Sequence, residues 1–588
     1  MNRKDTNTRH SSTWVLLALL VAASFAVRVA AWGYWRTGAI ESEGAEYARI
    51  AENLRNGVGY QGIVSPGPQL VFPPLFPVLI AGASLVTHDY ELAGRLVALV
   101  LGALLPLPVF GIASRLFNRN AGFIAAALTL LHPVLVNLSF SVLSEGPYTT
   151  LFLAAVYVVV RALGHPSIQW WLLVGGAFGL AYLTRQEAMA AVLIAMVFAL
   201  TATEGSAALR CKRAAAALGV FLLLALPEVI LIYRATGKIR LEGKSTQFFA
   251  LGQRMLAADA NPGLDHATHD VQADEPSPAP NAPSWQSWEE KWAFYAVDSH
   301  LNVTGAAMRS HSDVVRETRI PPGALLHLVE KGVRQNAPRL VSRLSERWFG
   351  APFLPALALL GVFRRPWRRP QAVSRMFVML IAAAPVVATF SALWTQDRYY
   401  FVLIPFFCIW AGNGLLELGL WTKTSSTAVG WTILSLPAVS EYVIPGLIGL
   451  AMVIYPIPAV RDPQFIFAFS SPSTRVEKEV GLSVGQQQHP VRIMDLSIPL
   501  AFYAEAQWVM FPYCDAESAL RFLDKERVDY VVLRRGVVFT KYYGDWLNEG
   551  IPDSRAELLH LSPDAAARFV IYRWHSTARA GAGGQLGS

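Results

Sequence analysis

Long apolar stretches separated by short polar links run along most of this chain, and they restrict its fold more than any other feature. A helix that crosses a bilayer needs about 20 mostly apolar residues. About eleven stretches approach this length: 14–33, 91–113, 121–139, 146–163, 170–185, 187–203, 214–233, 350–363, 376–394, 399–419 and 441–459. Only 16% of the residues are charged, against about 25% in soluble domains. The sequence therefore predicts an α-helical polytopic membrane protein.

A shorter apolar stretch at 74–86 decides the topology. It has about 13 residues, a length typical of an interfacial or re-entrant segment. If it does not cross, the basic residues between the spans share one side with the basic N-terminus: Arg3, Lys4, Arg9, Arg115, Arg119, Arg161, Arg210, Lys212, Arg213, Arg364, Arg365, Arg368, Arg369 and Lys423. The positive-inside rule makes this side cytoplasmic. We expect a multi-pass protein of the plasma (inner) membrane with a cytoplasmic tail at 1–13.

The same topology divides the chain into regions. The membrane module covers 14–459, with a first outer loop at 33–90 and a long outer loop at 234–349. The region 460–578 is predicted to be a small extracytoplasmic α/β domain, because strand-like and helical segments alternate there: 491–494, 497–505, 508–511, 516–525 and 529–533. The stretch 428–460 is long enough for one crossing or two. The Gly-rich end at 579–588 is expected to be disordered.

Charge and cysteine content exclude two classes of function. The net charge is +8, but the basic residues form short clusters between apolar spans instead of one polar face, so we expect no nucleic-acid partner. The three cysteines, Cys211, Cys408 and Cys514, have no obvious partners. We therefore expect neither a disulfide framework nor a zinc site.

The first outer loop carries a cluster of acids at the start of a predicted helix. Apolar residues from Tyr47 onward follow helical spacing. At about 100° per residue, Glu43 falls inside the apolar stripe and Glu46 at its edge, whereas Arg49 and Glu52 fall on the opposite face. A carboxylate held against an apolar surface suits general-base chemistry. The alternative is that Glu43 only favours the positive end of the helix.

Other ionisable residues lie at the predicted outer ends of the spans. His132 ends one span and Glu145 begins the next, and such residues at membrane depth are functional candidates; helix capping is the alternative for Glu145. Arg185 and Arg398 lie on the outer side, against the charge rule. An arginine there can hold a lipid phosphate by paired hydrogen bonds, or can extend to the interface without a ligand.

Several short motifs, taken in their order along the chain, resemble a known family. They are Glu43-Gly44-Ala45-Glu46-Tyr47, Ala51 to Gly57, Pro73-Pro74-Leu75-Phe76-Pro77, Ser144-Glu145, Leu183-Thr184-Arg185 and Arg398-Tyr399. Together they resemble the GT-C superfamily, in particular glycosyltransferase family 39, which includes protein O-mannosyltransferases and lipid A aminoarabinose transferases. Glu43 departs from the family, which usually has aspartate at this position.

The resemblance implies a transferase that moves a hexosyl or pentosyl group from a polyprenyl-phosphate donor, with inversion, on the extracytoplasmic face. The acceptor would be a protein, a lipid or a cell-envelope glycan. The resemblance assigns Glu43 as general base and Glu145 as a second acid that orients the acceptor or a metal. Six more residues are candidates for substrate binding: Glu46, Tyr47, His132, Arg185, Arg398 and Tyr399. Arginine or a divalent metal would balance the phosphate charge, and no other cofactor is expected.

Three other functions remain open at this point. A multi-pass transporter of a lipid or sugar fits the many spans, although the chain has no inverted hydropathy repeat. A glycan ligase that uses lipid-pyrophosphate donors and a non-catalytic assembly protein are the others. A nucleotide-sugar donor is not expected, because no Gly-rich phosphate loop follows a strand.

Overall fold

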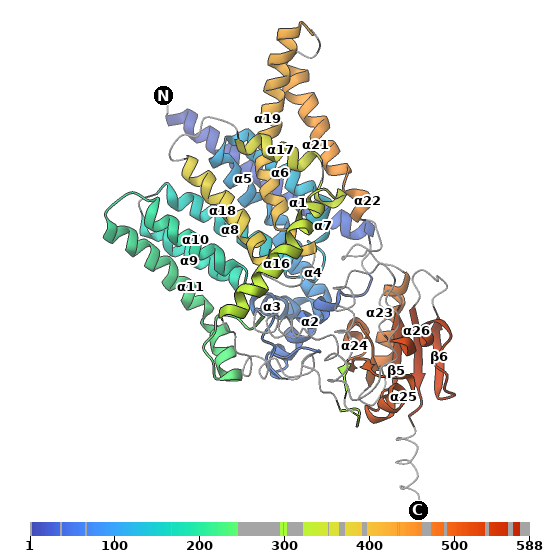
Figure 1. The fold of residues 1–588 in the computed structure, drawn as a ribbon. Coiled ribbons are helices and arrows are strands. Elements are labelled where there is room, and N and C mark those ends of the chain that lie inside the picture. The colour runs from blue at the N-terminus through green and yellow to red at the C-terminus, as the bar shows by residue number, and fades with distance from the viewer. Residues whose placement is uncertain are drawn as a thin grey trace, which may run out of the picture.

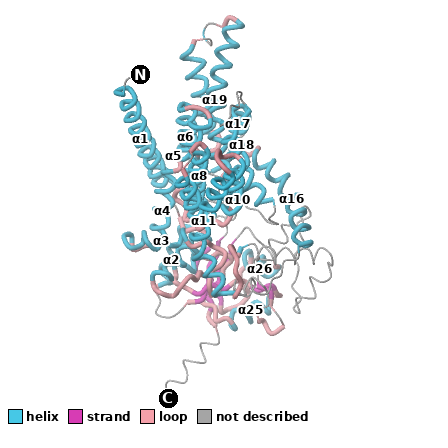
Figure 2. The backbone as a smooth tube through the Cα atoms, turned by 90° about the vertical axis from the view of Figure 1, so that its left-hand side faces the viewer, coloured by secondary structure: helices cyan, strands magenta, loops and turns pink. Residues whose placement is uncertain are grey.

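The computed structural model describes most of the chain as a helical bundle with a small mixed sheet at one end (Figure 1). The described residues are 3–35, 38–64, 67–165, 167–244, 295–297, 299–302, 322–350, 352–363, 371–390, 397–431, 433, 436–460, 472–486, 491–534, 540–561 and 569–576. The Pro-rich stretch 275–283 and the end at 579–588 lie outside them. Figure 2 shows that the strands gather at the end of the bundle where α2 and α3 lie. The predicted fold class is confirmed.

Apolar composition produces the bundle. Within the described part of the chain, five helical stretches are long and apolar enough to cross a membrane: Thr13–Tyr34 in α1 (Arg3–Trp35), Tyr90–Leu116 formed by α4 (Tyr90–Leu104) and α5 (Pro106–Leu116), α8 (Glu145–Leu163), α11 (Ala207–Thr236) and α19 (Leu403–Val429). Shorter apolar helices complete the module: α6 (Arg119–Leu131), α9 (Ile168–Tyr182), α10 (Ala188–Thr201), α17 (Phe353–Phe363) and α18 (Gln371–Phe390). The less apolar α16 (Pro322–Leu344) lies beside the bundle.

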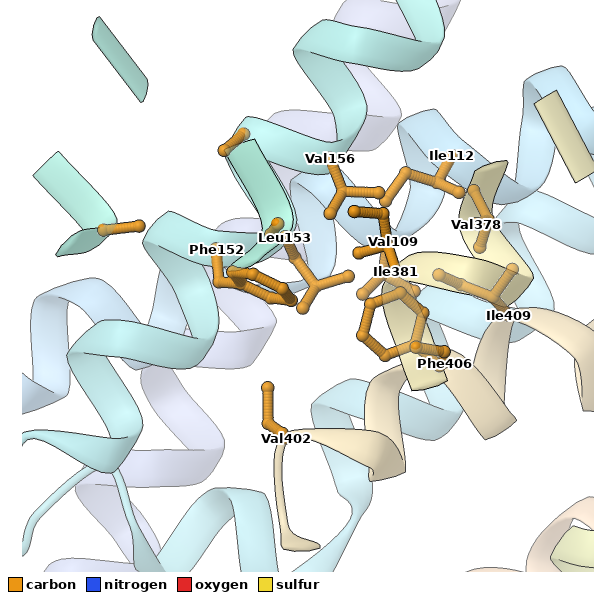
Figure 3. Packing of buried hydrophobic residues seen from close by; sticks show 14 of the residues in the cluster. Val109, Ile112, Phe152, Leu153, Val156, Val378, Ile381, Val402, Phe406 and Ile409 are labelled. Carbon is orange, nitrogen blue, oxygen red and sulfur yellow. The ribbon is translucent and has the colours of Figure 1, made fainter. Parts of the chain in front are cut away.

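The core of the bundle forms where α5, α8, α18 and α19 meet. Figure 3 shows Val109 of α5, Phe152 of α8, Ile381 of α18 and Phe406 of α19 pointing toward one another. All four side chains are fully buried. Branched and aromatic side chains of this kind fill the space between helices and fix their crossing geometry.

The short apolar segment forms a helix that packs on the end of the bundle. It is α3 (Leu75–Thr87), whose 13 residues are too few to span. It packs against α2 (Ser42–Arg55) and the start of α4, and the backbone N–H of Leu75 donates to the carbonyl of Leu183 at 2.8 Å. This contact ties the first outer loop to the turn after α9.

The chain returns once after α19. The π-helix η4 (Ala438–Val443) and α21 (Ile444–Ile454) pack back along α19, and Lys423 pairs with Glu441 at 2.7 Å. The stretch 428–460, left open by the sequence, therefore holds one returning helix, followed by α22 (Ile457–Val460). This return leads to the C-terminal domain at the end of the bundle where α2 and α3 lie (Figure 1).

The C-terminal domain is a five-stranded mixed sheet in the order β3-β2-β5-β7-β6. Its strands are β2 (Arg492–Met494), β3 (Gln507–Val509), β5 (Tyr530–Arg534), β6 (Ala556–Leu561) and β7 (Phe569–Trp574). β2 is parallel to β3 and β5, and β7 is antiparallel to β5 and β6. Its helices are α23 (Pro472–Gly485), α24 (Pro499–Tyr503), α25 (Ala516–Lys525) and α26 (Lys541–Asn548). The long outer loop adds β1 (Tyr295–Ala296), which pairs with β4 (Pro512–Tyr513).

Candidate active site

The acids of α2 are buried in the reverse of the predicted order. The side chain of Glu43 is 30% exposed, whereas Glu46 is 3% exposed. The helical projection expected Glu43 in the buried stripe and Glu46 at its edge, which is wrong. The projection assumed one buried face, but protein covers α2 on several sides. The supposedly water-facing Arg49, for example, donates to the backbone carbonyl of Phe502 in the C-terminal domain at 3.2 Å.

Glu46 fixes the loop that follows α2. Its carboxylate accepts the backbone N–H groups of Ile63 and Val64 at 2.5 and 3.0 Å. Burial raises the pKa of Glu46, although these two donors act in the opposite direction. A Cβ atom on Gly62 would clash with the same carboxylate. The structure therefore places Glu46 in a backbone contact of the loop.

Tyr47 joins the Pro-rich segment to the turn that carries Glu145. Its ring packs on Phe72 and Phe76, with centroids 4.8 and 5.1 Å apart. Its hydroxyl donates to Oγ of Ser144 at 2.9 Å. Both contacts come from α2, one turn after Glu43, so they determine where the start of α2 lies relative to α8.

Arg398 bridges the two candidate catalytic acids. Glu145 begins α8, and its Oε1 lies 3.3 Å from Nε of Arg398 and 2.8 Å from a guanidinium nitrogen of Arg185. A second nitrogen of Arg398 donates to Oε1 of Glu43. Burial acts to lower the pKa of Arg398, but the carboxylates of Glu145 and Glu43 outweigh it and raise this pKa above its ordinary value. Arg398 therefore stays a cation in contact with both acids.

Two further charged residues complete the site. Glu187 accepts from Arg185 at 3.0 Å and lies 3.3 Å from Nζ of Lys244. The ring of Tyr399 faces all three cations, at 5.1 Å from Arg185, 5.3 Å from Lys244 and 5.7 Å from Arg398. Attraction to the ring face stabilises cations at such distances.

We refer to the six charged residues of this site as the ion cluster: Glu43, Glu145, Glu187, Arg185, Lys244 and Arg398. Three acids balance three bases. Sequence reasoning missed two members. Glu187 was detectable because it follows Arg185 by two positions in a tight outer turn, whereas Lys244 stands alone in a long loop and gives no local signal.

His132 does not join the ion cluster in the described structure. It lies between α6 and α7 (Pro133–Asn137), is 4% exposed, and has no hydrogen-bond partner on either ring nitrogen among the described residues. No described contact links it to Glu145 or Arg398.

A divalent metal does not fit the ion cluster as arranged. Among the described residues, no group of three or more His, Cys, Asp or Glu side chains has the geometry of a metal site. The guanidinium of Arg398 occupies the position between Glu43 and Glu145 where shared carboxylates would hold an ion. We therefore derive no step through a metal.

Comparison with known proteins identifies the fold. A family model described as dolichyl-phosphate-mannose-protein mannosyltransferase matches residues 71–231. ArnT from Cupriavidus metallidurans bound to undecaprenyl phosphate is 14% identical, with a TM-score of 0.51, over 97% of this chain and 99% of that one. The oligosaccharyltransferase of Archaeoglobus fulgidus in complex with Zn and sulfate is 13% identical, with a TM-score of 0.51, over 94% and 72%. No curated protein matches the chain in sequence.

The family model covers less than half of this chain, and the two solved structures are similar to the chain in fold. The family match covers Glu145, Arg185 and Glu187 of the ion cluster, but it begins after Glu43 and ends before Arg398. The fold therefore completes the ion cluster from segments on either side of the matched region.

Proposed function

We propose that this chain is a glycosyltransferase of the GT-C superfamily, which transfers a sugar from a polyprenyl-phosphate donor to an acceptor hydroxyl or amine, with inversion and with Glu43 as general base. The observation that carries the proposal is the bridge made by Arg398 between Glu43 and Glu145. This bridge joins the partly exposed carboxylate of Glu43 to the guanidinium of Arg398, a group suited to binding phosphate. The site lies where α2, α8 and α19 begin, at the same end as the C-terminal domain, so reaction on the extracytoplasmic face follows from the expected orientation.

The charge changes of the reaction match this arrangement. The acceptor oxygen or nitrogen forms a bond to the anomeric carbon as the bond from that carbon to the phosphate oxygen breaks. The acceptor proton passes to Glu43, and the lipid phosphate leaves with one more negative charge than it had in the donor diester. Glu43 loses one negative charge in the same step. Fixed cations aimed at the leaving group stabilise a transition state of this kind.

Arg398 is suited to follow this charge. In the absence of donor its guanidinium is shared between Glu43 and Glu145. A phosphate at the cluster would compete with Glu43 for the same nitrogen, because guanidinium binds phosphate oxygens in the paired geometry it uses for carboxylates. Donor binding would then release the base, while Glu145, at 5% exposed, keeps Arg398 in place.

Glu145 and Arg185 have supporting roles in this proposal. Glu145 is buried between two guanidinium groups, so it holds both arginines and does not take the acceptor proton. Arg185 and Lys244 are the second and third cations for the phosphate. The sugar and the acceptor, whether protein, lipid or glycan, are not specified by these residues.

Substitution of Glu43 tests the base. We expect Glu43→Gln to lower kcat by about 10²–10⁴-fold, the range for loss of a general base, with donor affinity within a few-fold of wild type. Glu43→Asp, which keeps the carboxylate, should retain part of the turnover. The assay uses purified protein in lipid nanodiscs with polyprenyl-phosphate sugars. Unchanged turnover in Glu43→Gln would remove the assignment.

Substitution of Arg398 tests the phosphate contact in the same assay. Loss of a charge-assisted hydrogen bond costs about 1.5–3 kcal/mol, so Arg398→Ala should weaken lipid-phosphate binding by about 10–100-fold. Because this change leaves Glu145 buried without one partner, Arg398→Lys serves as a second variant that keeps the charge. Normal donor affinity in both folded variants would contradict the role of Arg398.

A further inference from the structure

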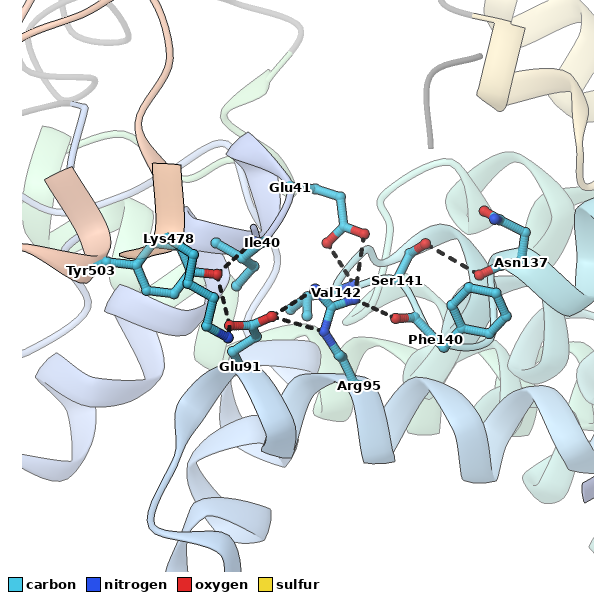
Figure 4. Close-up of polar contacts among 10 residues, drawn as sticks. All are labelled: Ile40, Glu41, Glu91, Arg95, Asn137, Phe140, Ser141, Val142, Lys478 and Tyr503. Carbon is cyan, nitrogen blue, oxygen red and sulfur yellow. Dashed lines mark hydrogen bonds and ion pairs between the residues drawn. The ribbon is translucent and has the colours of Figure 1, made fainter. Parts of the chain in front are cut away.

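A second buried ion network lies between the C-terminal domain and the start of α2. Its centre is Glu91, in the first turn of α4 and 5% exposed. One carboxylate oxygen accepts from Arg95 at 2.7 and 3.0 Å. The other accepts from Nζ of Lys478 at 2.8 Å and from the hydroxyl of Tyr503 at 2.7 Å. One carboxylate thus binds the membrane module through Arg95 and the C-terminal domain through Lys478 and Tyr503 (Figure 4).

The network holds the residues that lead into α2. The hydroxyl of Tyr503 accepts the backbone N–H of Ile40 at 2.7 Å. The side chain of Glu41 lies 3.8 Å from a guanidinium nitrogen of Arg95 and accepts the backbone N–H of Val142 at 3.0 Å. Glu41 is the N-cap residue of α2, yet its side chain makes no capping bond. It reaches across to the network, two positions before Glu43.

The same network holds the segment that leads into α8. A guanidinium nitrogen of Arg95 donates to the backbone carbonyl of Phe140 at 2.6 Å, and Val142 is tied to Glu41. Figure 4 shows the carbonyl of Phe140 beside the guanidinium of Arg95, and the backbone of Val142 beside the carboxylate of Glu41. Val142 precedes Glu145 by three positions. The two segments that carry Glu43 and Glu145 are therefore fixed to one centre.

Ion pairs within the C-terminal domain hold α23, the helix that carries Lys478, to the sheet. Lys478 follows Glu477 in α23, and Glu477 pairs with Arg534 of the sheet at 2.6 Å. Arg534 also pairs with Asp495 at 2.6 Å. Glu477 therefore contacts the sheet, whereas the next residue of the helix, Lys478, contacts α4. Buried ion pairs are weak evidence for added stability, so we look for their role in the placement of the elements that they join.

We propose that the Glu91 network is a positioning device through which the C-terminal domain sets the distance between Glu43 and Glu145. Lys478 and Tyr503 are positioning residues, because their described hydrogen bonds are to Glu91 and Ile40 and not to the ion cluster, so they act on the acids through the network. The inference rests on the proposed function for its effect on turnover. Its effect on the position of α2 does not depend on that function.

A disulfide measurement tests the position of α2 without any substrate. The hydroxyl oxygens of Ser42, the first residue of α2, and Ser497 of the domain lie 2.9 Å apart. In a Cys211→Ala background, the pair Ser42→Cys and Ser497→Cys should form a disulfide rapidly under mild oxidation. Adding Lys478→Met and Tyr503→Phe should slow its formation by about tenfold or more, because such a loss of preorganised geometry lowers effective concentration strongly.

Three controls make this measurement decisive. Lys478→Arg keeps the ion pair and should restore the rate of disulfide formation. Lys525→Met removes a lysine whose described hydrogen bonds are to Asn302 and to the backbone of His300, and should leave the rate unchanged. Equal rates with and without the Lys478→Met and Tyr503→Phe changes, or failure of the disulfide to form in the starting background, would overturn the proposal.

Turnover supplies the second measurement. Lys478→Met with Tyr503→Phe should lower kcat by about tenfold or more, while the Kd for lipid phosphate stays within about twofold, because Arg185 and Arg398 keep their contacts with Glu145 whatever the distance to Glu43. A general loss of structure would change both constants together, and that outcome would contradict a positioning role. If the wild type transfers no sugar, the proposed function fails while the disulfide rates still decide this inference.

Discussion

At the scale of single residues, one guanidinium determines how the candidate site can work. Arg398 contacts an accessible acid, Glu43, and a buried acid, Glu145. The buried contact is the stronger constraint, because removing one partner of a buried pair costs about 3–5 kcal/mol. The accessible contact is weaker and can be exchanged for a ligand. Because the two acids differ in exposure, Glu145 is suited to hold Arg398 in place and Glu43 is suited to act as the base.

Another buried acid, Asp495, makes the stability of the C-terminal domain depend on pH. Burial raises the pKa of Asp495 to about 6 from 3.8, although Arg534 acts against this. The folded-state pKa is above the unfolded value. Protonation of Asp495 therefore stabilises the folded domain fully below about pH 4, and this stabilisation is lost as the pH rises through about 6. A difference of this size corresponds to about 3 kcal/mol at most.

Comparison with Asp495→Asn isolates this contribution. Between about pH 4 and 7, the midpoint for thermal unfolding of the wild type should fall relative to that of Asp495→Asn. Differential scanning calorimetry measures both midpoints. The exposed Asp545→Asn serves as the control and should follow the wild type. Parallel pH profiles for wild type and Asp495→Asn would disprove the shift.

Sequence predicts which residues carry charge at the outer ends of the helices, but not how those charges pair. Glu43, Glu145, Arg185 and Arg398 could be chosen because charge is expensive beside a membrane. Lys244 could not, because only the fold brings residue 244 back to the turn of Glu187. The burial order of Glu43 and Glu46 also depends on the loop at 61–64 and on α24, which no helical period encodes.

At the scale of helices, a close crossing sets the position of α19. A Cβ atom on Gly361 of α17 would clash with the carbonyl of Trp410, and one on Gly414 of α19 with the carbonyl of Leu357. The amide of Asn413 donates to the carbonyl of Gly361 at 3.0 Å. Small residues allow such backbone contact between membrane helices. The turn with Arg398 (η3, Asp397–Tyr400) leads directly into α19.

Gly414→Ala should separate these helices and destabilise the protein by about 1–3 kcal/mol, the usual cost of overpacking. Gly219→Ala is a matched control in α11, because a Cβ atom there meets nothing within 4 Å. It should be neutral or stabilising by up to about 1 kcal/mol, since alanine is the better helix former. Thermal unfolding in detergent measures both. Equal effects of the two changes would rule out the close crossing as the cause.

Local pattern predicted the elements that carry the apolar pattern of their own type and missed those that form only through pairing with another strand. The strand at 491–494 and the helix at 516–525 have the apolar pattern of their type. β6, Ala-Glu-Leu-Leu-His-Leu, consists largely of good helix formers and becomes a strand because it pairs with β7. β1 has two residues, and its partner β4 lies far away in the sequence. No local pattern predicts such a pairing.

At the scale of the whole molecule, the two ends of the bundle differ in what they carry. One end carries the ion cluster, α2, α3 and the C-terminal domain (Figure 1). At the opposite end of α10 from Glu187, the first two turns of α11 carry Arg210, Lys212 and Arg213. By the positive-inside rule we expect these basic residues to face the cytoplasm. The proposed reaction then takes place outside, where lipid-linked sugars would have to be presented.

The native cysteines allow a direct test of this orientation. Cys211 is exposed among these basic residues at the start of α11, whereas Cys408 and Cys514 are buried. A membrane-impermeant maleimide added to intact cells should therefore leave the wild type unlabelled and label Cys211 only after the cells are opened. A variant with Cys211→Ser and the exposed Glu517→Cys of α25 should be labelled in intact cells. Labelling of Cys211 from outside would place the ion cluster in the cytoplasm and require a donor that is presented there.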